Sequence, residues 1–350
     1  MKNKDFYRLI EVSGTPRDMG LQHGRQLRAR IHRTVQAMRE RIGPEAYEAS
    51  WRSFQQTARY CRANVPELVE EMEGIAEGAE IEFRDVLNVN AHLDLANWRR
   101  LVWNAHNETD ATACSSHAVV TDSDVLLGWN GDDWHGWMDC GVVVRGRPDR
   151  GQPFIYWSLA GSLGRPGMTP HLALGANSLP SPRWRADGLL YPMLCRKLLA
   201  CCSAEEALEV FHRYPRCSAM NYLIADRSGL LIDVESTDDR HAVLSPQHHG
   251  PGSYLLHTNS YLDASLTESQ LGPQACPRLT AAQRLYAEKT PADVAEVREI
   301  QSDHTGGICV HEPEACTIVS FVAEIRPGRF HVTRGNPCQA PVRTYSLHAE

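Results

Sequence analysis

A single cysteine lies where the chain changes from helix-forming to strand-forming residues. Cys114 belongs to the segment DATACSSHAVVTDSDVLLGWNGDDW, residues 110–134. A strand after Cys114, a turn and a returning antiparallel strand would bring residues near 130 back beside residue 114. The hairpin therefore predicts that Asn130 and Asp132 lie next to Cys114. A thiol nucleophile, an amide and a carboxylate would then meet at one end of a sheet.

A nucleophilic thiol needs a base, and no histidine is well placed to serve Cys114. His117 is three residues away on the same strand, and side-chain alternation points it to the opposite face. Cleavage of the peptide bond between Ala113 and Cys114 would supply another base, because it frees an α-amine with a pKa of about 7.7–8.0. Such an amine can accept the thiol proton. Self-cleavage is therefore one way to complete the site.

The residues before Cys114 favour helices. Helical spacing of apolar residues predicts one helix from Pro16 to about residue 42, ended by Gly43-Pro44. Further helices are expected over 45–63, from Pro66 onward and from about residue 84.

After residue 115 strands and helices alternate in blocks. Strands are expected in HAVV, DVLLGWN, CGVVVRG, PFIYWSLAG and YLLHTN, hairpins over 221–236 and 316–335, and helices over 189–200, 204–214, 278–288 and 291–300. No repeat and no linker-like composition divides the chain. The order helices, strands, helices, strands indicates an α+β layered architecture in a single unit, residues 1–350.

Composition narrows the function classes. The 350 residues are 42% hydrophobic and 23% charged, as in ordinary globular proteins. A net charge of −7, from 36 basic and 43 acidic residues, argues against a partner such as nucleic acid or an anionic membrane. With no secretory signal and no apolar run of roughly 18–20 residues, we expect a cytoplasmic protein. The usual nucleotide, zinc-protease and α/β-hydrolase motifs are missing from the sequence.

The eleven cysteines are expected to be free thiols, most of them buried. No CxxC pair occurs, and Cys309, His311 and Cys316 match no familiar ligand spacing, so no metal site is expected. One alternative is a metal-dependent hydrolase built on His248, His249 and the C-terminal Cys and His residues. Such an enzyme would carry a stoichiometric metal.

Five blocks in order resemble a known family. They are GTPRDMGLQHGRQLRARI (14–31), ACSSHAV with LLGWNGDDW (113–134), NYLIADRSGLLIDVE (221–235), LLHTNSYLD (255–263), and DHTGGICVH with CTIVSFVAEI (303–325). These blocks resemble the autoproteolytic acyltransferase/hydrolase family. Isopenicillin N acyltransferase typifies this family, whose members are similar to acyl-CoA:6-aminopenicillanic acid acyltransferase. They are more distantly similar to the choloylglycine hydrolases. The resemblance covers most of the chain.

The resemblance implies a four-layer αββα sandwich of the N-terminal-nucleophile (Ntn) hydrolase type. It implies cleavage between Ala113 and Cys114. Residues 1–113 would form a helical pro-segment or α subunit, and residues 114–350 a catalytic β subunit that begins at the nucleophile. The two subunits would stay associated, and an oligomer is possible.

The resemblance also implies roles for individual residues. Cys114 takes the place of the nucleophile, and Asp132 that of the carboxylate that orients the new α-amine. Asn259, in the HTN motif, takes the place of the oxyanion-hole amide. Asn177, in LGANSLP, aligns near the second oxyanion asparagine of the choloylglycine relatives.

The chain departs from the family pattern around the nucleophile. Ala113 stands where glycine is common, which would slow cleavage. Gly131 replaces the tryptophan of the N-W-D motif, and Trp129 stands where glutamine or arginine is common. The pocket wall should therefore differ, with Trp129 and Asn130 as candidate substrate or oxyanion contacts. Trp129, Trp134 and Trp137 could form either core or an aromatic acyl pocket.

A further departure concerns the substrate. Ser320 is followed by Phe321, whereas the fungal enzyme has a substrate-binding arginine there. This argues against penicillin as the substrate.

The expected function is an acyltransferase or amidohydrolase. It would take an acyl group from an amide, or from a thioester co-substrate such as acyl-CoA, onto Cys114 as a thioester and pass it to water or an amine. Its partners would be a small-molecule acyl donor and an amine acceptor, with no other cofactor. The alternative is an unprocessed, non-catalytic relative that binds a small molecule or acts as a scaffold, which Ala113 and Gly131 would favour. The intact mass of the protein distinguishes these two possibilities, because an unprocessed chain keeps its full mass.

Overall fold

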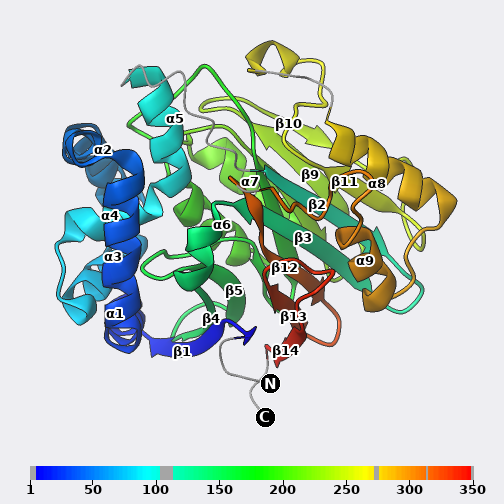
Figure 1. Ribbon diagram of the computed structural model, residues 1–350, viewed down its shortest axis with the longest axis horizontal. Helices are drawn as coiled ribbons and strands as arrows, with labels where there is room; N and C mark the ends of the chain where they lie inside the picture. The colour runs from blue at the N-terminus through cyan, green and yellow to red at the C-terminus, as the bar shows by residue number, and fades with distance from the viewer. Residues whose placement is uncertain (1–4, 103–112, 272–275, 313, 348–350) are drawn as a thin grey trace.

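The computed structural model describes residues 5–102, 113–271, 276–312 and 314–347. Within these ranges the chain forms two β-sheets flanked by helices (Figure 1). One sheet has eight strands in the order β1-β4-β5-β6-β7-β8-β9-β10, and the other has six in the order β11-β2-β3-β12-β13-β14. No helix in these ranges is both long and apolar enough to cross a membrane.

The helices are α1 (Pro16–Ile42), α2 (Pro44–Asn64), α3 (Pro66–Ala79), α4 (Phe83–Asn90), α5 (His92–Val102), α6 (Tyr191–Leu199), α7 (Ala204–Arg213), α8 (Pro277–Glu288) and α9 (Val294–Gln301). The eight-stranded sheet contains β1 (Arg8–Gly14), β4 (Gly141–Pro148), β5 (Phe154–Leu159), β6 (Gly167–Met168), β7 (Leu172–Ser178), β8 (Met220–Asp226), β9 (Leu231–Ser236) and β10 (His241–Leu244). The six-stranded sheet contains β2 (Ala113–Val120), β3 (Val125–Asp133), β11 (Tyr254–His257), β12 (Cys316–Glu324), β13 (Arg329–Arg334) and β14 (Val342–Ser346).

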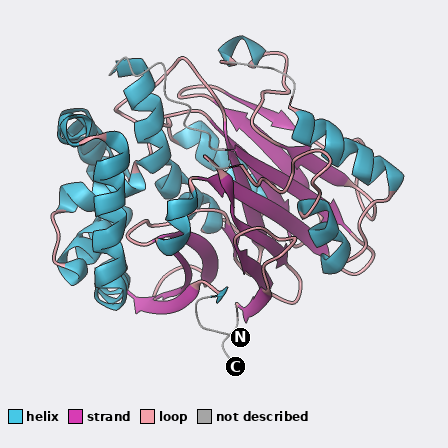
Figure 2. Ribbon diagram, in the orientation of Figure 1, coloured by secondary structure: helices cyan, strands magenta, loops and turns pink. Residues whose placement is uncertain are grey.

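The two sheets pack face to face, with β2 and β3 against β7 and β8. On the outer side of the eight-stranded sheet, α1 contacts β1, α6 contacts β7 and α7 contacts β8. On the outer side of the six-stranded sheet, α8 contacts β11 and α9 contacts β3 and β12 (Figure 2). The predicted α+β class and four-layer αββα sandwich are confirmed.

The N-terminal segment differs from expectation because it is not wholly helical. Strand β1 pairs in parallel with β4, from Arg8 opposite Val142 to Gly14 opposite Pro148. A seven-residue strand at a sheet edge carries too short an alternation to be predicted from sequence. All the other strands of this sheet follow Cys114 in the chain, so the segment before the expected cleavage site completes a sheet of the segment after it.

Paired glycines let α1 and α3 pack closely. Gly20 and Gly24 of α1 face Gly74 and Gly78 of α3. A Cβ atom on Gly24 would lie only 2.4 Å from the backbone carbonyl oxygen of Ile75, so the two backbones leave no room for larger residues. The GxxxG pattern near the N-terminus therefore serves the packing of two helices.

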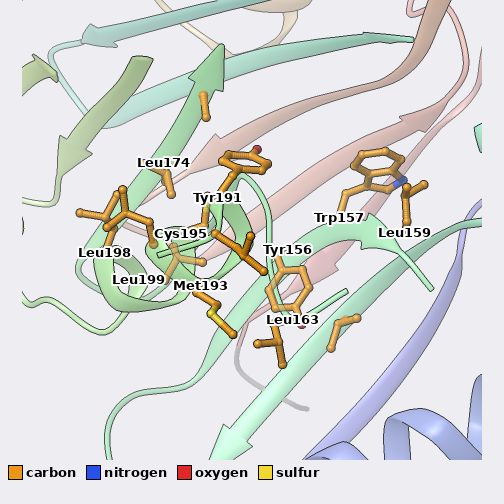
Figure 3. Close-up of a cluster of buried hydrophobic side chains, with 14 of the residues drawn as sticks. Tyr156, Trp157, Leu159, Leu163, Leu174, Tyr191, Met193, Cys195, Leu198 and Leu199 are labelled. Atoms are coloured by element: carbon orange, nitrogen blue, oxygen red, sulfur yellow. The ribbon is translucent and has the colours of Figure 1, made fainter. Parts of the chain in front are cut away.

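Helix α6 fastens the outer helical layer to the eight-stranded sheet. Its buried side chains Tyr191, Cys195 and Leu198 belong to the same hydrophobic cluster as Tyr156 and Trp157 of β5 (Figure 3). Tyr191 and Trp157 also reach the cavity at Cys114. The core thus rigidly supports one wall of the candidate site.

Candidate active site

The predicted hairpin is present and sets the position of Cys114. Strands β2 and β3 pair antiparallel, with Cys114 opposite Gly131 and Ala113 opposite Asp132. The connecting turn is closed by a hydrogen bond from the Thr121 backbone N–H to the Asp124 carbonyl oxygen, 2.9 Å long. Asp132 therefore lies beside the bond that precedes Cys114. The segment 103–112, which leads into Ala113, lies outside the described residues.

The backbone of Cys114 is held on both sides by side chains. Its N–H donates to Asn259 Oδ1 at 2.8 Å, and its carbonyl oxygen accepts from Arg278 Nη1 at 2.7 Å. The same guanidinium donates through Nη2 to Asn259 Oδ1 at 2.8 Å. Asn259 follows β11 and Arg278 lies in the first turn of α8, so two separate elements converge on this one residue.

Asn259 meets Cys114 through its oxygen. Its Nδ2 donates to the Ser178 carbonyl oxygen at 2.8 Å and to the Ser178 hydroxyl at 3.2 Å. The orientation follows from its neighbours, since a backbone N–H and a guanidinium can only donate. The resemblance implied an oxyanion-hole donor at Asn259, whereas in this uncut chain its side-chain oxygen accepts a hydrogen bond from the Cys114 nitrogen.

Arg278 is a site residue that the sequence reasoning missed. It was expected only as the start of a helix, and an arginine beside the first-turn Pro277 is usually solvated. Its side chain is 14% exposed and also lies 3.5 Å from Asp132 Oδ2. Nothing local distinguishes Arg278 from other helix arginines, because its partners are 19 to 164 residues away.

Asp132 is buried, and burial raises its pKa to about 7. Arg278 opposes this rise, as does the hydroxyl of Thr317, which donates to Asp132 Oδ1 at 2.7 Å. The adjacent Asp133 raises the pKa further. The carboxyl therefore changes its charge near neutral pH, beside the nucleophile.

The Cys114 thiol is a weak acid in the uncut chain. Burial raises its pKa to about 12, and the charge of Asp132 adds to the rise, while a hydrogen bond from the Asp132 backbone and the Arg278 charge oppose it. At neutral pH the sulfur is protonated, so a nucleophilic role requires a base.

His117 does not supply that base. Its Nδ1 lies 2.8 Å from the Tyr286 hydroxyl on α8, and burial lowers its pKa to about 4. It faces the outer helices while Cys114 borders the cavity described next, so the predicted alternation is confirmed. Among the described residues, no histidine hydrogen-bonds the Cys114 sulfur.

A small cavity of about 20 Å³ lies at Cys114, with room for about one water molecule. Its walls are Leu93, Cys114, Trp129, Gly131, Asp132, Asp133, Trp157, Arg165, Ala176, Ser178, Tyr191, Met220 and Ile318. Trp129 donates through Nε1 to the Ala176 carbonyl oxygen at 2.7 Å. Of the three tryptophans considered above, Trp129 lines the cavity, Trp137 is in the core and Trp134 is half-buried.

The two departures at positions 129 and 131 fit together. A Cβ atom on Gly131 would lie 2.4 Å from Cη2 of the Trp129 indole. The indole thus occupies the space that a side chain at 131 would need. Relative to the family pattern, the large residue at position 129 is thus accompanied by a glycine at position 131.

A buried arginine lies in the wall of this cavity. Arg165 is 6% exposed, and its guanidinium lies over the rings of Trp157 and Tyr191. Its Nη2 is 2.9 Å from His92 Nδ1, while its Nε has no partner among the described residues. The cavity wall thus holds one arginine, Arg165, and two acidic residues, Asp132 and Asp133.

Asn130 does not contact the cavity, contrary to expectation. Alternation turns its side chain toward α9, where Nδ2 donates to the carbonyl oxygens of Gln301 at 2.9 Å and Ile308 at 3.1 Å. Asn130 is therefore an anchor for the loop after α9. Asn177 is not in the cavity wall either; its Oδ1 accepts from the Ser116 hydroxyl at 2.5 Å, and its Nδ2 has no partner among the described residues.

A buried charge network supports the segment that carries Asn259. His257 Nε2 lies 2.8 Å from Glu235 Oε1, and Nδ1 lies 2.7 Å from the Thr258 carbonyl oxygen. Burial alone would lower the pKa of His257, but Asp233 and Glu235 outweigh it and raise that pKa. The His257 imidazole, held between Glu235 and the Thr258 carbonyl oxygen, fixes the turn just before Asn259.

The C-terminal cysteines and histidines group differently from the pattern considered in the sequence. The ligand atoms of His304, Cys309, His311 and Cys338 all lie within 4.8 Å of one another, and Cys316 is not among them. His248 and His249 are exposed and belong to no such group among the described residues.

Comparison with known proteins identifies the family. A Drosophila melanogaster beta-alanyl-dopamine/carcinine hydrolase is 24% identical over 323 residues, covering 85% of this chain and 80% of its own. Two solved structures each cover 67% of this chain: a conjugated bile acid hydrolase from Clostridium perfringens, with TM-score 0.44, 16% identity and 96% of its chain covered, and penicillin V acylase from Agrobacterium tumefaciens, with TM-score 0.42, 15% identity and 86% covered. Residues 124–339 match the sequence profile of acyl-coenzyme A:6-aminopenicillanic acid acyl-transferase. The chain belongs to this acyl-transferase family.

Proposed function

We propose that this protein is an Ntn amidohydrolase or acyltransferase whose nucleophile, Cys114, becomes N-terminal by self-cleavage. The observation that carries the proposal is the 2.8 Å hydrogen bond from the Cys114 backbone nitrogen to Asn259 Oδ1. After cleavage that nitrogen is an α-amine, and the same acceptor would hold it beside its own thiol. This provides the base that the thiol otherwise lacks.

Self-cleavage would proceed through the thiol. The sulfur adds to the carbonyl carbon of Ala113, the bond from that carbon to the Cys114 nitrogen breaks, and the nitrogen takes up the thiol proton. Water then hydrolyses the thioester, which frees the Ala113 carboxyl group and returns a proton to the sulfur. Asp132, the register partner of Ala113, and Arg278, on the Cys114 carbonyl oxygen, supply the charges around the reacting bond.

The two chains would stay associated after cleavage. Strand β1 remains paired with β4, and contacts across the cut are numerous. Asn90 of α4 accepts from the Leu163 backbone N–H at 2.8 Å and donates to the Gly161 carbonyl oxygen at 3.0 Å. The buried Glu71–Arg196 ion pair also joins the two segments at 2.9 Å.

In turnover the α-amine would take the thiol proton, and the sulfur would attack the acyl carbonyl. The leaving group takes the proton, and water or an amine then displaces the acyl group from the thioester. The donor could be an amide or an acyl thioester such as acyl-CoA. Asn177 Nδ2 and backbone N–H groups are our candidates for stabilising the oxyanion, where one lost donor typically costs about 10²–10³ in rate.

The substrate we propose is the amide of a short, polar acyl group with an amine. The Drosophila relative is named for beta-alanyl-dopamine and carcinine. The charged and ionisable side chains of Arg165, Asp132 and Asp133 around Cys114 suit a short polar group better than a long aliphatic chain. The position after Ser320 holds Phe321, which is part of the buried core, so no arginine is available there for a penicillin carboxylate.

The test is intact mass and N-terminal sequencing of the purified wild-type protein, with Cys114→Ala and the matched thiol control Cys316→Ala. We expect fragments 1–113 and 114–350 from the wild type and the control, and one uncut chain from Cys114→Ala. An uncut wild-type chain without hydrolase activity would favour the non-catalytic alternative. An uncut chain that is active would show that another base serves Cys114.

A further inference from the structure

Four metal-ligating side chains from two loops converge on one side of the molecule, outside the site at Cys114. His304 and Cys309 lie in the loop after α9, His311 lies just before β12, and Cys338 lies in the turn after β13. His304 and His311 are exposed, Cys309 is buried and Cys338 is half-buried. Two imidazoles and two thiols are the donor set of many structural zinc sites.

The separations of these donors match a tetrahedron. Around a zinc ion with bonds of roughly 2.3 Å to sulfur and 2.0–2.1 Å to nitrogen, the S–S edge is about 3.8 Å and each S–N edge about 3.6 Å. Cys309 Sγ and Cys338 Sγ are 3.7 Å apart, and His311 Nε2 lies 3.4 Å from each of them. The His304 ring centroid lies 5.0 Å from that of His311, and its ligand atom lies within 4.8 Å of the other three, so a small rotation of this exposed side chain would complete the tetrahedron.

We propose that His304, Cys309, His311 and Cys338 bind one zinc ion in a closed tetrahedral site. A disulfide does not account for the group, because the two sulfurs lie well beyond a bonded distance of about 2.05 Å and the two histidines would have no part in it. Asn336 donates through Nδ2 toward Cys309 Sγ at 3.5 Å and to the Val310 carbonyl oxygen. Such outer hydrogen bonds support a metal-bound thiolate.

The role of the metal would be structural. Four protein ligands leave no position for water or substrate, unlike a catalytic zinc. The site would join the loop after α9 to the turn after β13. That loop forms one wall of an open cavity of about 1120 Å³, which is also lined by Ala113 and Arg278.

The loop is also connected to the residues around Cys114. Val310, between two of the ligands, donates its N–H to Thr317 Oγ1 at 2.9 Å, and that hydroxyl donates to Asp132. The Ile308 carbonyl oxygen accepts from Asn130. Zinc would therefore fix the wall of the entrance beside the Ala113–Cys114 bond without touching the reacting atoms.

The test is the zinc content of the full chain, which is purified without chelators or a metal-affinity tag and measured by elemental mass spectrometry. We expect one zinc ion per chain. Cys338→Ser, and His311→Gln at an exposed ligand, should each lower the zinc affinity at least about tenfold. Cys316→Ser and Cys202→Ser are the matched thiol controls and should keep the metal. Replacement by Co²⁺ should give thiolate charge-transfer absorption that Cys338→Ser weakens.

Cys114→Ala, which should remain uncut, is expected to bind the same amount of zinc, so this test stands apart from the test of cleavage. Circular dichroism of each variant in zinc-free buffer separates loss of the metal from loss of the fold. The proposal is overturned if the protein neither contains zinc nor takes up added Zn²⁺. Equal zinc affinity in Cys338→Ser, or a protein lighter by two hydrogens with Cys309 and Cys338 disulfide-bonded, would also overturn it.

Discussion

The two groups of reactive side chains in this molecule are built differently. Cys114 and Asp132 lie on paired strands of one hairpin, and their positions follow from strand register. His304, Cys309, His311 and Cys338 lie in loops, and their positions follow from how the loop after α9 packs against the turn after β13. The first group has a buried carboxyl, a guanidinium and a cavity, while the second has four metal-ligating donors within 4.8 Å of one another.

The difference indicates a reactive role for the residues around Cys114 and a structural role for the four-donor group. A nucleophile needs open space in front of it and charges that change during the reaction, and the cavity at Cys114 offers both. A closed set of four ligands offers no open space, but it can hold loops that the sheets do not reach. Substitutions in the two regions should therefore change different measurements.

The largest expected effect is at Arg278, which binds both the Cys114 carbonyl oxygen and Asn259. Arg278→Met should lower the rate of self-cleavage and the kcat of any cleaved fraction by at least about 10²-fold, because the Cys114 carbonyl oxygen and Asn259 would lose the donor that holds the nucleophile in place. Mass spectrometry over time and steady-state kinetics measure both. Zinc content should not change.

Arg278→Lys is the matched variant, because a single ammonium cannot replace the forked guanidinium on two acceptors. We expect only partial recovery. Normal cleavage in Arg278→Met would mean that Asn259 alone positions the Cys114 nitrogen.

The next effect is at Asp132, whose buried carboxyl has its pKa raised to about 7. In the wild type, activity should increase as pH rises through about 7 and the carboxylate forms. Asp132→Asn should lose the limb near 7 and about 10²-fold of the rate, while the limb of the α-amine at about 7.7–8.0 should remain. Profiles of kcat/KM against pH for both proteins measure it, and an unchanged limb near 7 would assign it to the α-amine instead.

The same group makes a prediction for stability with the opposite sign. Because the pKa of Asp132 is higher in the folded chain than its usual value of 3.8, the folded state holds a proton that the unfolded state has lost between these values. Its contribution to the free energy of unfolding therefore falls as pH rises from about 4 to about 7. Asp132→Asn should raise Tm relative to the wild type at pH 8 more than at pH 4.

The same contrast explains how far the sequence could be interpreted. Cys114 and Asp132 were predictable because a hairpin fixes which residues are neighbours, and the four layers followed from the family resemblance. Arg278 was not, since its partners come from other segments of the chain. The orientation of Asn259 and the four-donor cluster depend on loop packing, which leaves no periodic pattern. Strand β1 was missed because its pairing partner, β4, lies more than a hundred residues away.

A smaller effect is expected from Trp129 and Gly131, the two neighbouring residues of the cavity wall that depart from the family pattern. Gly131→Ala puts a Cβ atom into the Trp129 indole, and overpacking of this kind costs about 1–3 kcal/mol. We expect a lower Tm and about a tenfold loss of kcat/KM. Adding Trp129→Phe to Gly131→Ala should restore part of both losses, because the smaller ring frees the space. Strictly additive effects would show that the two positions do not compensate each other.

The smallest expected effect is at Thr317, whose hydroxyl connects the two regions. It donates to Asp132 Oδ1 at 2.7 Å and accepts from the Val310 N–H at 2.9 Å. Thr317→Val keeps the shape but removes the hydrogen bond that lowers the pKa of Asp132, so that pKa should rise further. The rising limb of the pH–rate profile should move to higher pH by less than about one pH unit, which is a few-fold loss of activity at neutral pH.

Thr317→Ser retains the hydroxyl and should keep the wild-type profile. Zinc affinity should be unchanged in both variants, since Thr317 touches no ligand atom, and a loss as large as that of Cys338→Ser would mean that the two regions act as a single unit.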